Sequence, residues 1–366
     1  MFRLLSLFFV VFSGALNAVS LSKVEDIVSR KMLNPDIPAL AVSIISSGKI
    51  VHLSAKGFSD LDNQIHATVD TPFHVASVSK TVTNMVVFHM VQSGKIRLHE
   101  NINNYLPFNV INPHHPKDQI TVAELLNHLS GVLDNEDFYL PYWSNPQGDP
   151  KFGLEGFLKN YLVPGGRFYT QKNFEDADRY KVYDYSNTGY ALLGLIVERV
   201  SGKTFDDYVN EYLFSPLGIK HSAFSLGYFD NKDVSKTYTS AEGKLRFKGF
   251  NGYPDYPAGL LRTSIADYSR LIAGYLNADK SPFPLTQKTT SLITPEIIDD
   301  KDRAYTWFVR KINDHRYYHH DGADLGARAE VIMDVKNRNA VMVFTNSETD
   351  LSSLIAEIEA AVFGQL

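Results

Sequence analysis

The chain has 366 residues, 44% hydrophobic and 21% charged, which is typical of a globular protein and excludes a disordered tail, a collagen-like repeat and a coiled coil. The net charge of −5 gives no basic footprint, so we expect no nucleic-acid partner. Without cysteine there is neither a disulfide framework nor a thiolate metal site. The length favours about two domains.

Residues 1–18 have the pattern of a signal peptide. Arg3 is their only charge, the run from Leu4 to Phe12 is almost wholly apolar, and small residues follow. We expect cleavage near Ala18 or Ser20, with an uncleaved anchor as the alternative, because the apolar run is short for a membrane span. The mature protein would then be exported, periplasmic or secreted, without a stable membrane span. An exported chain without cysteine suits a bacterial envelope at least as well as a eukaryotic secretory route.

The first predicted elements are a helix, a hairpin and a longer helix. Residues 22–33 have an amphipathic pattern, and two β-branched runs over 39–46 and 49–55 flank a Ser-Gly turn. A long helical pattern covers 75–92 and ends before a glycine.

Helical patterns dominate the middle of the chain, and strand patterns return near its end. Further helices are predicted over 121–129, 188–200, 204–213 and 264–276. Strands are predicted over 305–312, 316–320, 327–334 and 340–346, before a closing helix over 351–363. We therefore expect an α+β fold. One antiparallel sheet would be built from both chain ends, 19–74 and 301–366, and flanked by helices, with a mainly helical domain, 75–300, inserted between them and carrying the active-site loops.

Several well-known catalytic motifs are absent. The sequence has no G-x-S-x-G elbow, no H-E-x-x-H, no P-loop and no G-x-G-x-x-G. Its two adjacent histidine pairs, 114–115 and 319–320, would point to opposite faces of a strand and so rarely share a metal. We expect no metal site.

One S-x-x-K motif stands out as a candidate nucleophile. The pattern occurs at Ser20, Ser46 and Ser77, but only Ser77 begins a long helical pattern, where residues i and i+3 share a face. The Lys80 amine could then reach the Ser77 hydroxyl and, if burial makes it partly neutral, take its proton. Backbone N–H groups at a helix start could also stabilise an oxyanion. The alternative is a helix-capping Ser77 and a solvated Lys80.

The segment 74–81 resembles the active-site segment of the serine β-lactamase and penicillin-binding-protein superfamily. The resemblance is to its class C-like branch, which includes class C β-lactamases, D-alanyl-D-alanine carboxypeptidases, D-aminopeptidases and related esterases. Other family motifs follow in the family's order: LLNHLSG at 125–131, YSNTGY at 185–190, FSPLGI at 214–219, AGLLRTSIAD at 258–267 and HDG at 320–322. Each motif is weak alone, but the ordered set, from about Val24 to the last helix, is specific.

The resemblance implies a role for each matched position. Ser77 would attack a carbonyl and form an acyl-enzyme, with Lys80 and Tyr185 sharing the work of the general base. Asn187 would hydrogen-bond the acyl side chain of the substrate. The backbone N–H groups of Ser77 and Ala323 would form the oxyanion hole. The family chemistry uses no metal or organic cofactor, and none is expected.

The third family element is H-x-G here, where many relatives have K-T-G. His320 and Gly322 would contact the substrate, and a mostly neutral histidine can donate a hydrogen bond but anchors a substrate carboxylate less strongly than lysine. The histidine therefore weakens the expectation of efficient β-lactam hydrolysis but does not argue against catalysis. Tyr185 could act as a base only if Lys80 and His320 depress its pKa.

Two matched residues are expected to be structural, and two segments depart from the family pattern. His128 would be a buried hydrogen-bonding histidine, and Asp267 a helix-cap partner of Ser264.

Residues 170–184 form a polar insertion that would either select substrate or be a solvated surface loop. An aromatic cluster would either line a substrate groove or pin its own loop: Phe138, Tyr139, Tyr142 and Trp143.

The sequence thus predicts an exported serine hydrolase that acts on an amide or ester, with D-amino-acid peptides or β-lactam-like compounds as substrates. A carboxylesterase on the same fold is the first alternative, since one scaffold hosts several chemistries. A catalytically silent binder of peptidoglycan, of β-lactams or of a partner protein is the second. The intact Ser77, Lys80 and Tyr185 argue against silence.

Overall fold

The computed structural model describes residues 18–138, 145–176, 181–230, 233–296 and 303–364. The predicted signal peptide lies almost entirely outside these residues and stays a prediction. Within the described part of the chain, no helix combines the length and hydrophobicity that a bilayer span requires.

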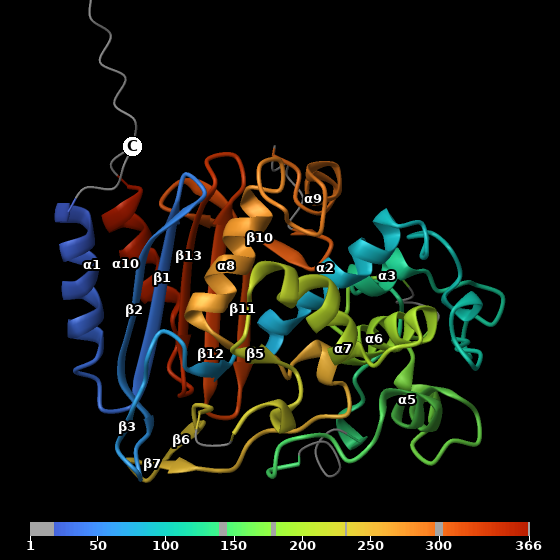
Figure 1. The fold of residues 1–366 in the computed structure, drawn as a ribbon. Helices are drawn as coiled ribbons and strands as arrows, with labels where there is room; N and C mark the ends of the chain where they lie inside the picture. The colour runs from blue at the N-terminus through green and yellow to red at the C-terminus, as the bar shows by residue number, and fades with distance from the viewer. Residues whose placement is uncertain (1–17, 139–144, 177–180, 231–232, 297–302, 365–366) are drawn as a thin grey trace, which may run out of the picture.

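An eight-stranded sheet forms one half of the described fold (Figure 1). Its strands lie in the order β3 (Ile65–His66), β2 (Lys49–Asp60), β1 (Ala39–Ser46), β13 (Asn339–Thr345), β12 (Ala327–Asp334), β11 (His315–Asp324), β10 (Trp307–Ile312) and β9 (Arg303–Ala304). All neighbours are antiparallel. Strands β1 and β13 come from opposite ends of the chain and pair directly, with Val42 opposite Val343. The predicted α+β sheet built from both chain ends is confirmed.

Helices cover both faces of this sheet. The helices α1 (Ala18–Lys31) and α10 (Ser352–Val362) lie side by side on one face and share an apolar core with it. Helix α8 (Ile265–Leu276) packs on the other face, where the rings of Tyr268 and Phe344 meet at 5.7 Å. Because both faces are covered, every residue of β1 is buried, which explains why its sequence is mostly apolar.

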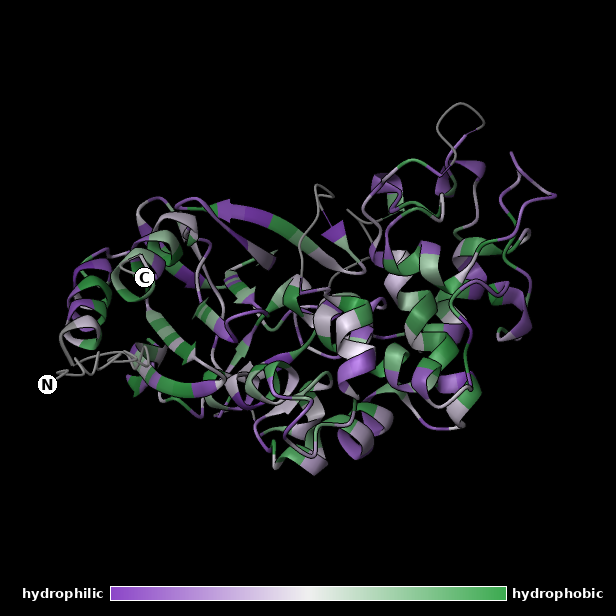
Figure 2. Ribbon diagram, turned by 90° about the horizontal axis from the view of Figure 1, so that it is seen from above, coloured by the Kyte–Doolittle hydropathy of each residue, from purple (hydrophilic) through white to green (hydrophobic). Residues whose placement is uncertain are grey.

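Most of the other helices pack around α6. Figure 2 shows this helical part of the molecule beside the sheet. Helix α6 (Asn187–Ser201) begins after Ser186, whose hydroxyl caps it, and ends at Gly202, whose φ of +71° suits glycine. The remaining helices of this region are α2 (Ser79–Gln92), α3 (Val122–Leu126), α5 (Leu154–Leu162), α7 (Phe205–Val209) and α9 (Gln287–Ile293). Two small sheets complete the fold: β4 (Pro72–His74) with β8 (Arg262–Ser264) and β5 (Ser222–Ala223), and β6 (Tyr238–Ala241) with β7 (Lys244–Phe247).

Two elements differ from their predicted bounds in ways that shape the site. The helix predicted over 75–92 starts with a separate 3-10 helix, Ala76–Val78, before α2. The strand predicted over 316–320 extends as β11 to Asp324 and runs on through Gly322. Both differences bring backbone N–H groups to the neighbourhood of Ser77.

Candidate active site

Ser77 is the middle residue of the 3-10 helix that precedes α2. The residue before it, Ala76, has a φ of +45°, which residues with a side chain rarely adopt. The Ser79 hydroxyl holds this turn, because it donates to Ala76 O at 2.5 Å and accepts from Leu261 N at 2.9 Å. The residue that caps α2 is Val78, without a side-chain bond, so Ser77 is not its capping residue.

Lys80 is fully buried and points its amine at the Ser77 hydroxyl. Its Nζ donates to Ser77 Oγ at 3.1 Å, to Asn187 Oδ1 at 2.6 Å and to the Ala258 carbonyl at 2.8 Å. Burial lowers the pKa of Lys80 to about 7, although nearby carboxylates, Asp255 foremost, favour the charged form. As a neutral amine, Lys80 would keep two N–H bonds to its amide acceptors and turn its lone pair to Ser77. The solvated Lys80 of the alternative interpretation is wrong.

Tyr185 lies against both the lysine and the nucleophile. Its ring centroid is 4.7 Å from Lys80 Nζ, and its hydroxyl is hydrogen-bonded to Ser77. Burial raises the pKa of Tyr185 well above 10, and the bond to Ser77 offsets this only in part. The condition under which Tyr185 could act as a base, a pKa depressed by Lys80 and His320, is therefore not met in the free protein. Tyr185 is a neutral phenol that can relay a proton but does not start as a phenolate base.

His128 supports the Tyr185 segment from behind. It is 3% exposed, and its Nδ1 accepts from Ser186 N at 3.0 Å. Its ring stacks on that of Tyr185, with centroids 4.4 Å apart. Burial lowers the pKa of His128 well below its usual range, so the ring is neutral at pH 7. The predicted structural role, a buried hydrogen-bonding histidine, is confirmed.

Asn187 is the first residue of α6, and its side chain bonds to Lys80. Its own backbone N–H donates to Asp134 Oδ2 at 2.6 Å, and the next N–H donates to Asp134 Oδ1 at 2.9 Å. A carboxylate at this position complements the positive end of the α6 dipole. Asp134 was missed in the sequence, where no motif includes it. Since Lys80 occupies Oδ1 of Asn187, only Nδ2 remains to donate to a substrate.

Gly322 allows β11 to approach the nucleophile. A Cβ at this position would lie 2.1 Å from the Val75 carbonyl oxygen and 3.1 Å from Ser77 N. Both are backbone atoms, so any other residue would push the strand away. Ala323 follows directly and is exposed. The predicted partners of the oxyanion hole, Ser77 and Ala323, thus belong to two segments in close backbone contact.

His320 is 1% exposed, and its Nδ1 lies 2.8 Å from the Asp321 carbonyl oxygen. A carbonyl only accepts, so Nδ1 carries the proton and Nε2 keeps a lone pair. Burial, and next the Lys80 charge, lower the pKa of His320 to about 3. The ring is therefore neutral, and its Nε2 would accept a hydrogen bond from a substrate. The ring thus donates through Nδ1 to Asp321 and not toward a substrate, and its weakness as a carboxylate anchor agrees with its neutrality.

Two other expectations concern loops and caps. Ser264 caps α8 by accepting from Asp267 N at 3.0 Å, as predicted, while the Asp267 carboxylate accepts from Lys220 N and His221 N. Phe138 is buried and packs against Phe168, with centroids 4.4 Å apart, so this member of the aromatic cluster pins its loop. The other three members lie outside the described residues.

The described parts of the 170–184 insertion are tied to the body of the protein. Glu175 N donates to the Gly131 carbonyl at 2.8 Å, and Lys181 pairs with Glu124 at 2.9 Å. The guanidinium of Arg303 lies 3.8 Å from the ring centroid of Tyr183. Residues 177–180 lie outside the described part, so substrate selection by this loop stays a prediction.

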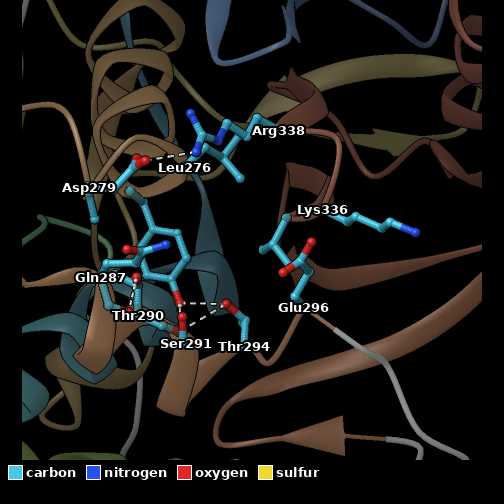
Figure 3. Close-up of a pocket in the computed structure, with 12 residues that line it drawn as sticks. Leu276, Asp279, Gln287, Thr290, Ser291, Thr294, Glu296, Lys336 and Arg338 are labelled. Atoms are coloured by element: carbon cyan, nitrogen blue, oxygen red, sulfur yellow. Dashed lines mark hydrogen bonds and ion pairs between the residues drawn. The ribbon is translucent and has the colours of Figure 1, made fainter.

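A cavity of about 110 Å³ lies elsewhere, between α8, α9 and the β12–β13 turn (Figure 3). An ion pair between Asp279 and Arg338, 2.9 Å long, crosses one side of it. None of the predicted site residues lines this cavity. Among the described residues, no three histidine or acidic side chains gather closely enough to hold a metal ion.

Several known proteins are similar to this chain in sequence or in fold. Protein flp of Staphylococcus aureus (strain MW2) is 22% identical over 348 residues, which is 92% of this chain but 65% of that protein, so the chain spans less than two thirds of this relative. The D-amino acid amidase from Ochrobactrum anthropi, solved with D-phenylalanine, is 17% identical, with a TM-score of 0.76 over 95% of this chain and 99% of that one. EstCE1, described as a hydrolase with promiscuous acyltransferase activity, is 16% identical, with a TM-score of 0.76 over 94% and 99%.

A family model decides the relationship. It describes the Beta-lactamase family and matches residues 24–363, from within α1 to the end of α10. The match thus includes Ser77, Lys80, Tyr185, Asn187 and the β11 strand. The chain therefore belongs to the Beta-lactamase family.

Proposed function

We propose that this protein is a serine hydrolase that cleaves an amide or ester bond through an acyl-enzyme on Ser77. One observation carries the proposal: the fully buried Lys80 amine lies 3.1 Å from the Ser77 hydroxyl and has a pKa of about 7. A serine is activated by a base that is neutral at the working pH and within hydrogen-bond reach. A protein that only binds its ligand has no need for a buried lysine with a lowered pKa beside a serine hydroxyl.

The proposed reaction moves one proton along three side chains. Neutral Lys80 takes the Ser77 proton as Oγ attacks the carbonyl carbon. The backbone N–H groups of Ser77 and Ala323 stabilise the oxyanion, and loss of one such donor typically costs about 10²–10³ in rate. The Tyr185 hydroxyl protonates the leaving group and recovers its proton from Lys80. A water molecule then attacks the acyl-enzyme ester. In this step Tyr185 and Lys80 take the proton from the water and return a proton to Ser77 Oγ, which regenerates the free serine.

D-amino-acid amides, D-amino-acid peptides and β-lactam-like compounds are the proposed substrates. The similarity of the fold to a D-amino acid amidase supports this choice. A carboxylesterase is the second candidate, because the neutral His320 supplies no positive charge for a substrate carboxylate. We also propose that the protein is exported, on the composition of residues 1–18. Terminal sequencing of the protein from its host's envelope or medium would test that: an N-terminus at Met1 would oppose cleavage.

Intact mass after reaction with covalent probes would test the function. The wild type and Ser77→Ala would each be incubated with a fluorophosphonate, a penicillin and a short acyl ester. Ser46→Ala is the matched control, because Ser46 begins another S-x-x-K sequence within the β1–β2 hairpin. We expect a phosphonate adduct on the wild type and the control, and none on Ser77→Ala.

The penicillin and ester results then separate the candidates. A lasting penicillin adduct favours a peptidase, and an adduct that disappears as product forms favours a β-lactamase. Fast ester turnover without a penicillin adduct favours the esterase. No adduct with any probe, in a sample shown to be folded, would favour the silent binder.

A further inference from the structure

A buried hydrogen-bond network lies beside the proposed oxyanion hole, and no step of the proposed reaction uses it. Its centre is the carboxylate of Asp324, the last residue of β11. His74 Nε2 lies 3.1 Å from Oδ2 of this carboxylate. The Tyr253 hydroxyl and the Leu325 backbone N–H donate to Oδ1 at 2.6 and 2.7 Å. The His74 and Asp324 side chains are 2% and 17% exposed, so these bonds form largely out of water.

The two partners stand next to the two segments that supply the oxyanion hole. Asp324 directly follows Ala323, and His74 is three residues before Ser77. The segments belong to different sheets, since His74 ends β4, which pairs with β8, whereas β11 lies in the eight-stranded sheet. The contact between His74 and Asp324 is thus a side-chain link between the two sheets at the site.

The geometry of β11 gives this link its effect. Side chains alternate along a strand, so Gly322 and Asp324 project to the same face. At Gly322 the strand lies against the Val75 backbone with no room for a Cβ. Two residues further on, Asp324 holds the residue that precedes Val75. The strand is therefore fixed on both sides of Ala323: by backbone contact before it and by the carboxylate after it.

The network also keeps Asp324 ionised and ties the loop of Tyr253 to the end of β11. Burial alone would raise the pKa of Asp324, but the bonds from His74 and Tyr253 hold it below its ordinary value, so the group is a carboxylate at neutral pH. The loop of Tyr253 has a second tie to the same turn, because Asn251 Nδ2 donates to Leu325 O at 3.1 Å. Buried Arg262 donates in turn to Asn251 O at 2.7 Å.

We propose that Asp324 is a positioning residue, which fixes the Ala323 N–H relative to the Ser77 N–H by holding the end of β11 to His74 and Tyr253. The inference rests on the proposed function, since it assigns a role within the same site. Asp324 itself would not touch the substrate. Its loss would weaken binding of the oxyanion, which exists only in the transition state, and leave ground-state binding nearly unchanged.

Three variants and one control test this role in the full-length folded protein. Asp324→Ala removes every bond, and Tyr253→Phe removes one. Asp324→Asn keeps an oxygen for Tyr253 and Leu325 and offers an N–H toward His74 Nε2. The control is Glu359→Ala on α10, because Glu359 is likewise a buried carboxylate that accepts from a tyrosine hydroxyl at 2.6 Å, on the opposite face of the sheet.

The readouts are kcat and KM for a short acyl ester, the inhibition constant of an arylboronic acid, and the unfolding midpoint. The boronate forms a tetrahedral adduct on serine and so reports on the oxyanion hole. For Asp324→Ala we expect kcat to fall about tenfold to hundredfold with KM within about threefold, and boronate binding to weaken by the same factor as kcat. The kcat of Tyr253→Phe should fall several-fold, and the kcat of Asp324→Asn should stay within about threefold of the wild-type value.

The outcomes separate this inference from the proposed function. If the wild type neither turns over the ester nor labels at Ser77, both proposals are overturned. If the wild type is active but Asp324→Ala keeps kcat within twofold, or if Glu359→Ala loses as much kcat for the same loss of stability, only the positioning role is overturned. Should Asp324→Ala not fold, Tyr253→Phe decides by the same kcat and boronate criteria.

Discussion

The amine of Lys80 lies closer to Asn187 than to the serine that it would activate: 2.6 Å from Asn187 Oδ1 and 3.1 Å from Ser77 Oγ. Asn187 is in turn fixed by its place at the start of α6, where the Asp134 carboxylate accepts its backbone N–H. A neutral amide next to the amine orients it without favouring the charged form as strongly as a carboxylate would. A neutral asparagine at this position thus contributes to the control of the Lys80 charge, which burial dominates.

Asn187→Asp tests this control. A carboxylate beside Lys80 stabilises the ammonium form and should raise its pKa by about one to three units. The rate of fluorophosphonate labelling at pH 7 should fall about tenfold or more and recover toward pH 9. Asn339→Asp is the matched control, because the side-chain oxygen of Asn339 likewise accepts a hydrogen bond, from Ser47 N at 2.9 Å. If the labelling rate of Asn187→Asp fell and did not recover at any pH, the loss would not come from the charge of Lys80.

The buried lysine should also make stability depend on pH. Lys80 has a pKa of about 7 in the folded protein against 10.5 ordinarily. Between these values the unfolded chain binds a proton that the folded chain lacks, so the free energy of unfolding rises with pH; below about pH 7 both states are protonated and this slope vanishes. Lys80→Met removes the titration. Both proteins would be unfolded with denaturant at several pH values from 7 to 10. The free energy of unfolding of the wild type should rise relative to that of Lys80→Met by on the order of 1 kcal/mol per pH unit. A constant difference would exclude a depressed pKa.

The sequence identified the parts of the fold and site that depend on local pattern. The apolar runs that became β1 and β13, and the i, i+3 spacing of Ser77 and Lys80, needed no knowledge of distant contacts. The contacts that tune the site were not predictable in this way. The Ala258 carbonyl binds Lys80 across 178 positions of sequence, and Asp134 reaches Asn187 across 53. A backbone acceptor or a lone acid carries no motif.

The pKa of Tyr185 could not be judged from the sequence for a related reason. The family resemblance implies that Lys80 and His320 lie near Tyr185, where cations would lower the pKa of the phenol. In the structure, burial is the largest influence on each of these pKa values: it lowers those of Lys80 and His320 and raises that of the Tyr185 phenol. How much water a side chain loses depends on every element packed around it, so it becomes visible only in the assembled fold.

Tyr185→Phe separates a proton relay from a base. The variant keeps the ring between His128 and Lys80 and loses only the hydroxyl. A relay is needed for a poor leaving group, so amide hydrolysis should fall about 10²–10⁴-fold, while an aryl ester should lose less than about tenfold. Tyr190→Phe is the control, because the Tyr190 ring also lies near Lys80, at 5.5 Å, but its hydroxyl bonds to Leu126 and Thr306. Equal losses on both substrates would instead indicate that Tyr185 deprotonates the serine.

Gly322→Ala tests whether the close approach of β11 is required. The added Cβ would lie 2.1 Å from the Val75 carbonyl oxygen, and no side-chain rotation can relieve a clash with backbone. The strand must move, which should cost about 1–3 kcal/mol of stability and reduce Ser77 labelling at least tenfold by displacing Ala323 N–H. Gly156→Ala is the control, because a Cβ there, within α5, meets nothing within 4 Å. The free energy of unfolding of Gly156→Ala should rise by about 0.5–1 kcal/mol, and its Ser77 should be labelled at the wild-type rate. Full labelling of Gly322→Ala would show that the oxyanion hole does not depend on this contact.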